Sequence, residues 1–236
     1  VAREFSPEKA AEYFAKAGFT KRDEKGVLVN DKGERLSFNI TYTRSPFSTG
    51  LMTRLKEEAI KAGVEFKLDG LDGSASFSKV QNKEHEISFA GWGVMPPFPR
   101  HYQGFHSYNA FEKGTKNPKK NTNNISSYAD PEMDTLSMGV RDATSLEEIE
   151  TKCHRIEEII HRDAPWVPGY TVPFARCGYW RWMKWPDNFN VRQIRDVYSS
   201  YVYWIDEDTK KETLDAKGSG KTFPEQDLIF DQYRQK

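Results

Sequence analysis

The chain has 236 residues, and its 35 Lys and Arg side chains balance 35 Asp and Glu, so the formal net charge is zero. Binding to nucleic acid or to an anionic membrane surface normally requires a basic excess, so this balance argues against both. The mean hydropathy is −0.79, and no run approaches the ~18 consecutive apolar residues of a membrane span. Aromatic residues make up 14% of the chain, enough for a core, and we expect a folded domain.

Aromatic residues are concentrated late in the chain, where 12 of the 32 fall between positions 166 and 204. Trp180, Trp182 and Trp185 in this segment would either line a groove or pack against a neighbouring domain. Exposed aromatic residues at this density usually mark an interface, which favours the second interpretation. We therefore expect part of the segment to be exposed when the chain is considered alone.

The two cysteines, Cys153 and Cys177, match no metal-ligand spacing and are too few for a disulfide scaffold. Two unpaired thiols are expected, although one bridge stays open for an oxidising compartment. The chain begins with Val1 and without a leader sequence, which suggests a processed protein or a fragment of a longer one.

The first ninety residues alternate between helical and strand patterns. Ser6-Pro7-Glu8 is typical of a helix start and Gly18 of its end. We then expect a hairpin over 27–42 around Asp31-Lys32-Gly33 and a helix over 46–62, with Leu51, Leu55 and Ala59 at helical spacing. A strand over 64–68 follows, then a short helix over about 74–83 with Phe77 and Val80 facing inward. The last element of this part is a strand over 87–92. This βαβαβ order predicts a largely parallel sheet with right-handed crossovers.

The remaining residues divide into a loop, two helices and a tail. Residues 95–128 contain four prolines and an Asn-rich stretch and resemble a long loop. Helices are expected from Pro131 to about Arg141 and from Leu146 to about Asp163, the second with a capping box of Ser145 and Glu148 and an apolar face that includes Leu146. Proline-punctuated strands follow from Val167, and residues 206–236 read as a polar surface extension.

Motifs for catalysis, cofactors and metals are weak. Gly218-Ser219-Gly220-Lys221-Thr222 resembles a phosphate loop, but Asp215 replaces the first glycine and Phe223-Pro224 follows where a helix should begin. His154 and His161 lie seven residues apart, too far for a paired metal site on one helix. No Gly-x-Ser-x-Gly elbow occurs. We therefore predict no enzyme activity, no cofactor and no metal.

Gly91-Trp92-Gly93 ends the third predicted strand. In open parallel sheets, ligands bind outside the carboxyl ends of the strands. Glycines on both sides of a tryptophan let the backbone approach a ligand while the indole offers a stacking face. A buried tryptophan beside two turn glycines would give the same pattern. His101 and His106, in the predicted loop, would either contact a ligand or lie on the surface.

In this order the features resemble family 5 extracellular solute-binding proteins, the peptide-binding subunits of bacterial ABC importers. The matching motifs span residues 6–174 and are Ser6-Pro7-Glu8-Lys9-Ala10 with Ala17-Gly18-Phe19, the strand from Gly33 to Tyr42, Leu55 to Gly63-Val64, Gly91-Trp92-Gly93, Ser127-Tyr128-Ala129-Asp130-Pro131-Glu132-Met133-Asp134, and Asp163-Ala164-Pro165-Trp166-Val167-Pro168.

The resemblance implies an α/β fold like the C-terminal lobe of a type II periplasmic binding protein, with a βαβαβ sheet flanked by helices and a strand-rich return segment. Residues 1–174 would form that lobe, and residues 175–236 would return to a first lobe that this chain lacks. The implied role is to capture a peptide or peptide-like solute between two lobes and deliver it to a membrane permease, without nucleic acid, in the periplasm or as a cell-surface lipoprotein.

The resemblance also implies a ligand site on this lobe, formed by Trp92, Gly93, Val94, Met95, His106, Ser107 and Asn109. Peptide-binding relatives often carry an Asp two residues after the Gly-Trp-Gly motif, where it binds a peptide amino terminus. Val94-Met95-Pro96-Pro97 stands there in this chain, so that contact does not carry over. A solute-sensing receptor module and a hydrolase completed by the missing part are the alternative hypotheses.

Overall fold

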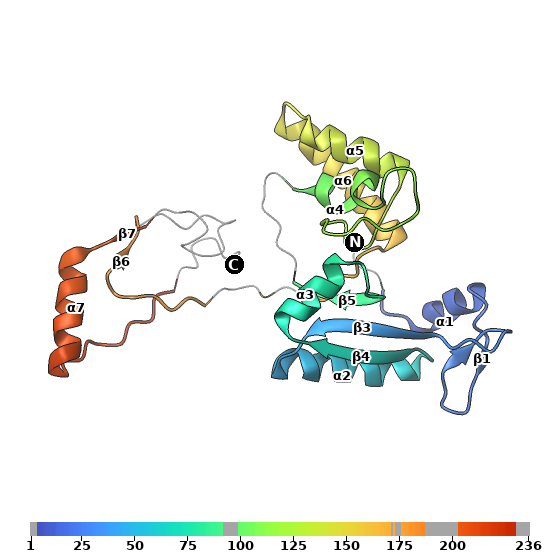
Figure 1. The fold of residues 1–236 in the computed structure, drawn as a ribbon, viewed down its shortest axis with the longest axis horizontal. Coiled ribbons are helices and arrows are strands. Elements are labelled where there is room, and N and C mark those ends of the chain that lie inside the picture. Colours follow the sequence, from blue (N-terminus) through green and yellow to red (C-terminus); the bar gives the residue numbers. More distant parts are fainter. Residues whose placement is uncertain (1–3, 92–98, 171, 173–175, 187–202, 230–236) are drawn as a thin grey trace. The chain divides into compact units, whose positions relative to one another are not determined.

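A computed structural model describes residues 4–91, 99–170, 172, 176–186 and 203–229 of the chain (Figure 1). Contacts divide these residues into two compact units. The described residues up to Trp166 form the first unit, and those from Val167 onward form the second. Each unit is described by itself below.

The first unit contains a three-stranded parallel sheet in the order β4-β3-β5. The central strand, β3 (Ser37–Thr43), pairs along its whole length with β4 (Glu65–Leu71) and over three residues with β5 (Ile87–Phe89). Helices α2 (Pro46–Lys61) and α3 (Gly73–Gln81) make the two connections. The predicted βαβαβ order and parallel sheet are confirmed, with β5 shorter than expected from 87–92.

The two faces of β3 meet different helices, which Figure 1 shows on opposite sides of the sheet. Ile40 and Tyr42 are buried against Met52 of α2. Thr41 points to the other face, where its hydroxyl donates to Asp69 at 2.9 Å and Lys79 of α3 donates to the same carboxylate at 2.8 Å. Right-handed crossovers to neighbours on opposite sides of one strand place their helices on opposite faces, as observed.

Local signals at the helix ends act as the sequence predicts. In α1 (Pro7–Lys16), Ser6 caps the first turn by accepting from the Lys9 amide at 3.2 Å. Helix α2 ends before Gly63, which has φ +89° and whose added Cβ would lie 2.6 Å from Cγ of Leu28. Only glycine suits both the left-handed backbone and this close approach.

The predicted 27–42 hairpin is confirmed in part: the turn at Asp31-Lys32-Gly33 forms, with the Gly33 amide donating to the Asn30 carbonyl at 3.0 Å, but the strand after it pairs back over only a few residues. β2 (Leu28–Val29) also pairs, on its other side, with a strand that was not expected, β1 (Lys21–Arg22), around a turn closed by Gly26. A single antiparallel bridge joins Val29 to Arg35, and β3 then continues into the parallel sheet. Across the turn, the Asn30 amide donates to the Glu34 carbonyl at 3.0 Å and the Leu36 amide to the Leu28 carbonyl at 2.7 Å. Beyond Leu36 the chain leaves the hairpin, and Ile40 and Tyr42 are buried against α2.

Three expected core residues are exposed. Phe77 of α3 is 66% exposed, Leu55 of α2 is 42% exposed, and Leu146 at the start of α6 is 64% exposed. Val80, in contrast, is buried as predicted, and Met52 rather than Leu55 fills the α2 side of the sheet core. Each exposed residue lies on an end or edge of a helical face, where periodicity alone does not place the boundary of the core.

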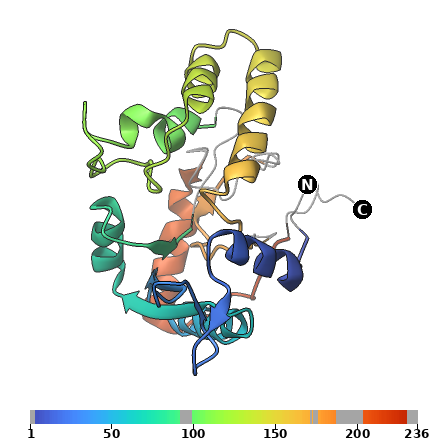
Figure 2. The same cartoon turned by 90° about the vertical axis from the view of Figure 1, so that its right-hand side faces the viewer.

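The rest of the first unit is helical, as Figures 1 and 2 show. It comprises α4 (His101–Phe105), a short 3-10 helix η1 (Ser107–Asn109), α5 (Pro131–Arg141) and α6 (Leu146–Asp163). The predicted α5 and α6 are confirmed, whereas the expected loop over 95–128 contains α4 and η1. The core of this part consists of Phe105, Met133, Val140, Ile149, Ile156 and Ile159, with Cys153, Ile160 and Trp166 packed at its edge.

Helix α6 shows the predicted capping residues with one difference. The Ser145 hydroxyl accepts from the Glu148 amide at 3.2 Å, but the Glu148 carboxylate accepts from the Thr144 amide at 3.1 Å instead of from Ser145. Ala164, with φ +50°, ends the helix in a left-handed conformation immediately before Pro165.

The second unit contains part of the expected strand-rich segment, and residues 187–202 of that segment lie outside the described residues. Its described strands, β6 (Met183–Lys184) and β7 (Trp204–Ile205), form a short antiparallel pair. The expected polar extension from 206 begins with a helix, α7 (Glu207–Ser219), in which Asp206 caps the first turn through the Thr209 amide at 2.7 Å. Gly218 and Gly220 of the phosphate-loop-like motif terminate this helix, and Lys221 pairs with Glu212 at 3.5 Å.

The described part of the aromatic segment is partly exposed, which confirms that prediction. Trp180 stacks on Trp182 with ring centroids 4.7 Å apart, yet Trp180 is 62% and Trp204 51% exposed. Trp166 instead packs on Phe105 of the first unit at 5.0 Å. Phe174, Phe189, Tyr198 and Tyr201 lie outside the described residues. Both cysteines are free thiols.

The helical core provides a stability test. Ile156 is fully buried in the middle of α6, so Ile156→Ala should lower the free energy of unfolding by about 2–5 kcal/mol through lost burial and a cavity. Leu146→Ala, on the exposed end of the same helix, should change it by less than about 0.5 kcal/mol. Urea unfolding followed by far-UV circular dichroism measures both, and equal effects would contradict the assigned core.

Candidate functional site

The predicted ligand residues divide between an undescribed and a described group. Trp92, Gly93, Val94 and Met95 lie outside the described residues, so their roles stay predictions. Gly91, directly before them, is described and exposed two residues after β5. Because β3, β4 and β5 are parallel, their carboxyl ends lie at one edge of the sheet, which is where a ligand is expected.

His106 and Ser107 are held by contacts within the fold. The Ser107 amide donates to Asp134 at 2.7 Å, and its hydroxyl donates to the other oxygen of the same carboxylate. Nδ1 of His106 accepts from the Tyr108 amide at 3.0 Å, and its ring lies 4.6 Å from the Tyr102 ring. These contacts fix the turn between α4 and η1, and contact of either residue with ligand stays a prediction.

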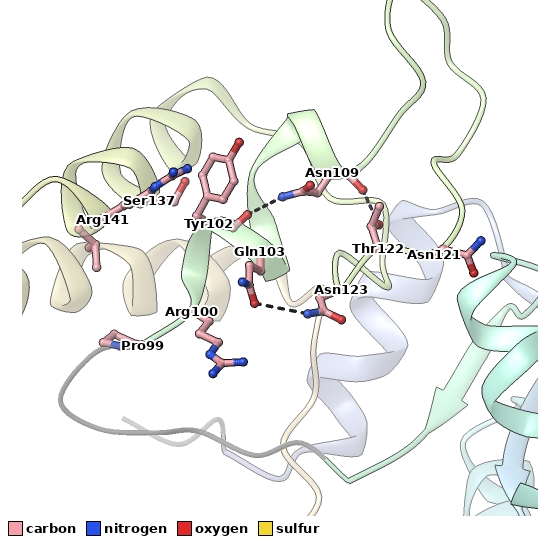
Figure 3. A pocket seen from close by; sticks show the side chains of 11 residues that line it. Pro99, Arg100, Tyr102, Gln103, Asn109, Asn121, Thr122, Asn123, Ser137 and Arg141 are labelled. Atoms are coloured by element: carbon pink, nitrogen blue, oxygen red, sulfur yellow. Dashed lines mark hydrogen bonds between the residues drawn. The ribbon is translucent and has the colours of Figure 1, made fainter. Parts of the chain in front are cut away.

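Asn109 is the predicted site residue that lines a cavity. Its side-chain amide donates to the Tyr102 carbonyl at 2.9 Å, and its own carbonyl accepts from the Thr122 hydroxyl at 2.6 Å. The residue thus joins the end of η1 both to α4 and to the Asn-rich stretch. Figure 3 shows Asn109 between these two neighbours.

The cavity, hereafter the polar pocket, has a volume of about 630 Å³, within the range of small-ligand sites. Its wall comes from α4, the end of η1, the Asn-rich stretch and the last two turns of α5 (Figure 3). Ser137 and Val140 are buried at its base, and Tyr102 is half-buried. The lining residues are Pro99, Arg100, Tyr102, Gln103, Asn109, Asn121, Thr122, Asn123, Ser137, Val140 and Arg141.

Asn124, fully buried behind the pocket wall, fixes the Asn-rich stretch. Its amide donates to the carbonyls of His106 at 3.2 Å and Tyr128 at 2.8 Å, and its oxygen accepts from the Tyr128 amide at 2.8 Å. A buried polar side chain must satisfy its hydrogen bonds. Asn124 does so by joining the backbone at His106 to the backbone at Tyr128. The sequence signalled only an Asn-rich loop, with no indication of which Asn is buried.

Lys83 ties the same stretch to the end of α3. Its ammonium group donates to the carbonyls of Thr122 at 3.0 Å and Asn124 at 2.9 Å, and burial lowers its pKa. The Asn121 amide also donates to the Gln81 carbonyl at 2.9 Å. These bonds connect the pocket wall to the helix that crosses between β4 and β5.

Other titratable groups of the helical part have shifted pKa values but do not line the pocket. The Tyr128 hydroxyl donates to Asp163 at 2.5 Å. The Arg162 guanidinium and this hydroxyl together lower the pKa of the Asp163 carboxyl to about 2, so the pair holds across the physiological pH range. Burial lowers the pKa of His101 on α4, which keeps that imidazole neutral near pH 7.

Among the described residues, no group of three or more His, Cys, Asp or Glu side chains is placed to hold a metal ion. No helix within those residues is long and apolar enough to cross a membrane.

Comparison with known proteins shows which family and which solved structures the chain resembles. Residues 1–112 match the family described as bacterial extracellular solute-binding proteins, family 5 Middle. No curated protein matches the chain. The fold is similar to that of several solved binding proteins, at identities that establish fold similarity alone.

Three of these structures illustrate the range of ligands and of sequence identity. The oligopeptide-binding protein AppA from Bacillus subtilis, in complex with a nonapeptide, is 20% identical with a TM-score of 0.63, covering 86% of this chain and 38% of that protein. DppA from Helicobacter pylori, in complex with peptide STSA, is 24% identical with a TM-score of 0.55, covering 70% and 28%. NikZ from Campylobacter jejuni, in complex with Ni(L-His), is 24% identical with a TM-score of 0.56, covering 69% and 31%.

The fold is thus a mixed α/β domain similar to type II periplasmic binding proteins. The predicted resemblance to family 5 extracellular solute-binding proteins is confirmed, with residues 1–112 matching the family itself. The chain spans no more than 38% of the length of the three solved proteins. The assignment of residues 1–174 to a C-terminal lobe, and of 175–236 to a return segment, stays a prediction.

Asn124 provides a test of how the pocket wall is held. Asn124→Ala removes three hydrogen bonds and leaves buried backbone groups without partners, so it should lower the free energy of unfolding by about 2–4 kcal/mol. It should also speed amide hydrogen exchange over residues 103–128. Asn123→Ala is the matched control, because Asn123 is exposed and its one side-chain bond is 3.4 Å long. Unchanged exchange in Asn124→Ala would refute its role.

Proposed function

We propose that the intact protein captures a peptide or peptide-like solute between two lobes and delivers it to the membrane permease of an ABC importer. One observation carries the proposal: the family match over residues 1–112, reinforced by fold similarity over 86% of the chain to an oligopeptide-binding protein. Two of the similar structures hold peptides, a nonapeptide and STSA. The family name supports an extracellular or periplasmic location, either free or as a surface lipoprotein.

In this proposal, residues 1–174 form one lobe and residues 175–236 return to the other. The exposed aromatic side chains of the second unit, Trp180 and Trp204 among them, support this division, because apolar area of this kind is normally covered by a partner surface. The chain would perform no covalent chemistry. Affinity would come from closure of two lobes on a ligand that favours the closed state.

The proposed ligand side of this lobe is the carboxyl edge of the sheet and the turn after α4. Trp92 and Gly93 would offer a stacking face and close backbone approach, Val94 and Met95 apolar contact, and His106, Ser107 and Asn109 polar contact. Asn109 supports this placement, because it lines the polar pocket directly after η1.

The test uses the full-length protein and a pool of random tetrapeptides, with bound peptides detected by native mass spectrometry. The wild type should retain peptides, and Trp92→Ala should reduce retention by about tenfold, equivalent to ~1.4 kcal/mol, through loss of a stacking face. Phe77→Ala is the matched control, because Phe77 is an exposed aromatic residue on α3 outside the proposed site.

The outcomes separate the competing functions. Unchanged retention in Trp92→Ala would place the ligand elsewhere on the protein. Recovery of shortened peptides from the pool would show a hydrolase and overturn the proposal. Retention of no peptide by the wild type would remove peptides as the ligand class.

A further inference from the structure

The polar pocket has an unusual charge for a chain with no net charge. Its lining includes two guanidinium groups, from Arg100 and Arg141, and no carboxylate. Its other polar side chains are neutral and belong to Tyr102, Gln103, Asn109, Asn121, Thr122, Asn123 and Ser137. The negative end of the α5 helix dipole, near Arg141, contributes about half an elementary charge and offsets only part of the Arg141 charge. The pocket therefore favours an anion.

Arg141 differs from most described arginines in its partners. Five of them form ion pairs with carboxylates: Arg35 with Asp23 and Glu65, Arg54 with Glu57 and Glu58, Arg155 with Glu132 and Glu158, Arg162 with Asp163 and Asp130, and Arg181 with Glu212. Within the part of the chain that the structure describes, no carboxylate oxygen lies within 4.0 Å of the Arg141 guanidinium. Its charge is thus available to a ligand.

The Tyr102 ring positions this guanidinium at the pocket. Cζ of Arg141 lies 5.1 Å from the ring centroid, a cation–π distance, and the ring of His106 lies 4.6 Å from the same Tyr102 ring. Figure 3 shows Arg141 beside Tyr102 and Ser137, whereas Arg100 lies on the far side of Gln103. Both arginines are exposed and stand at the rim, above the buried base of Ser137 and Val140.

From this geometry we infer that the polar pocket binds a carboxylate group of the solute, with Arg141 as the principal contact and Arg100 as a second positive charge. A planar guanidinium matches a carboxylate through paired N–H donors, and the neutral amides and hydroxyls around the rim supply further donors. The cavity of about 630 Å³ has room for the end of a peptide or a small organic acid. The inference rests on the proposed function where the carboxylate belongs to a captured peptide.

The first experiment compares two tetrapeptide pools on the full-length protein, one with free carboxyl ends and one with carboxyl-terminal amides. Retention of the free acids should exceed that of the amides by about tenfold or more. Arg141→Gln should abolish the difference, and Arg100→Gln should reduce it. Arg54→Gln is the matched control, because Arg54 is an exposed arginine on α2 that pairs with Glu57 and Glu58 away from the pocket.

A second experiment measures anion binding without peptides. Succinate and inorganic phosphate at millimolar concentration are titrated into the wild type and Arg141→Gln, with the midpoint of thermal unfolding as the readout. Succinate should raise the midpoint of the wild type and of Arg54→Gln, and not that of Arg141→Gln. A response to succinate with no peptide retained would assign the pocket to free organic acids and remove peptides as the ligand class.

Two results would overturn the inference and leave the proposed function intact. One is equal retention of free-acid and amide pools by the wild type. The other is a preference for free acids that persists unchanged in Arg141→Gln, which would place the carboxylate contact outside the polar pocket. A wild type that retains neither pool and does not respond to succinate or phosphate would refute the inference and the peptide-binding role together.

Discussion

The parallel hydrogen bonding of β3 to both β4 and β5 is the constraint on which the first unit depends. Parallel neighbours require a crossover between each pair of strands, and α2 and α3 supply the two crossovers on opposite faces. The same pairing brings the carboxyl ends of three strands to one edge. It also places the end of α3 where Lys83 and Gln81 hold the Asn-rich stretch. The sheet therefore defines the edge at which the ligand side of the lobe is proposed, and the helix that follows β4 supports one wall of the polar pocket.

Features encoded by neighbouring residues were predictable from sequence. The caps at Ser6 and Ser145, the prolines at helix starts and the glycine after α2 each act within a few residues, so the bounds of α1, α2, α5 and α6 follow closely. The alternation of Ile40 and Tyr42 with Thr41 identified a strand with two different faces. Strand and helix order then implied the parallel sheet, because a connection that contains a helix is long enough for a crossover.

Features that depend on distant residues were not predictable. The β1–β2 pair was missed because two-residue strands leave almost no alternation, and the turn at Asp31-Lys32-Gly33 indicated only the partner on the other side of β2. α7 was missed because it buries only Ala216 among its residues and has no apolar face to reveal it. In the candidate site, Asn109 was predicted only through the resemblance to the family. Arg141 was not predicted as a site residue, because in the sequence it looks like an ordinary solvated arginine at the end of a helix. Its contact with the Tyr102 ring is visible only in the folded structure.

The polar pocket is built differently from the parallel sheet. It contains no sheet strand, and its wall is held by side chains bonded to backbone carbonyls: Asn109 to Tyr102, Thr122 to Asn109, and Lys83 to Thr122. Such bonds fix donors and charges in place before a ligand arrives, which lowers the ordering cost of binding. Only eleven residues separate the end of β5 at Phe89 from the start of α4 at His101. In the proposed function, the carboxyl edge of the sheet and the wall of the polar pocket would thus belong to one lobe, with a short stretch of chain between them.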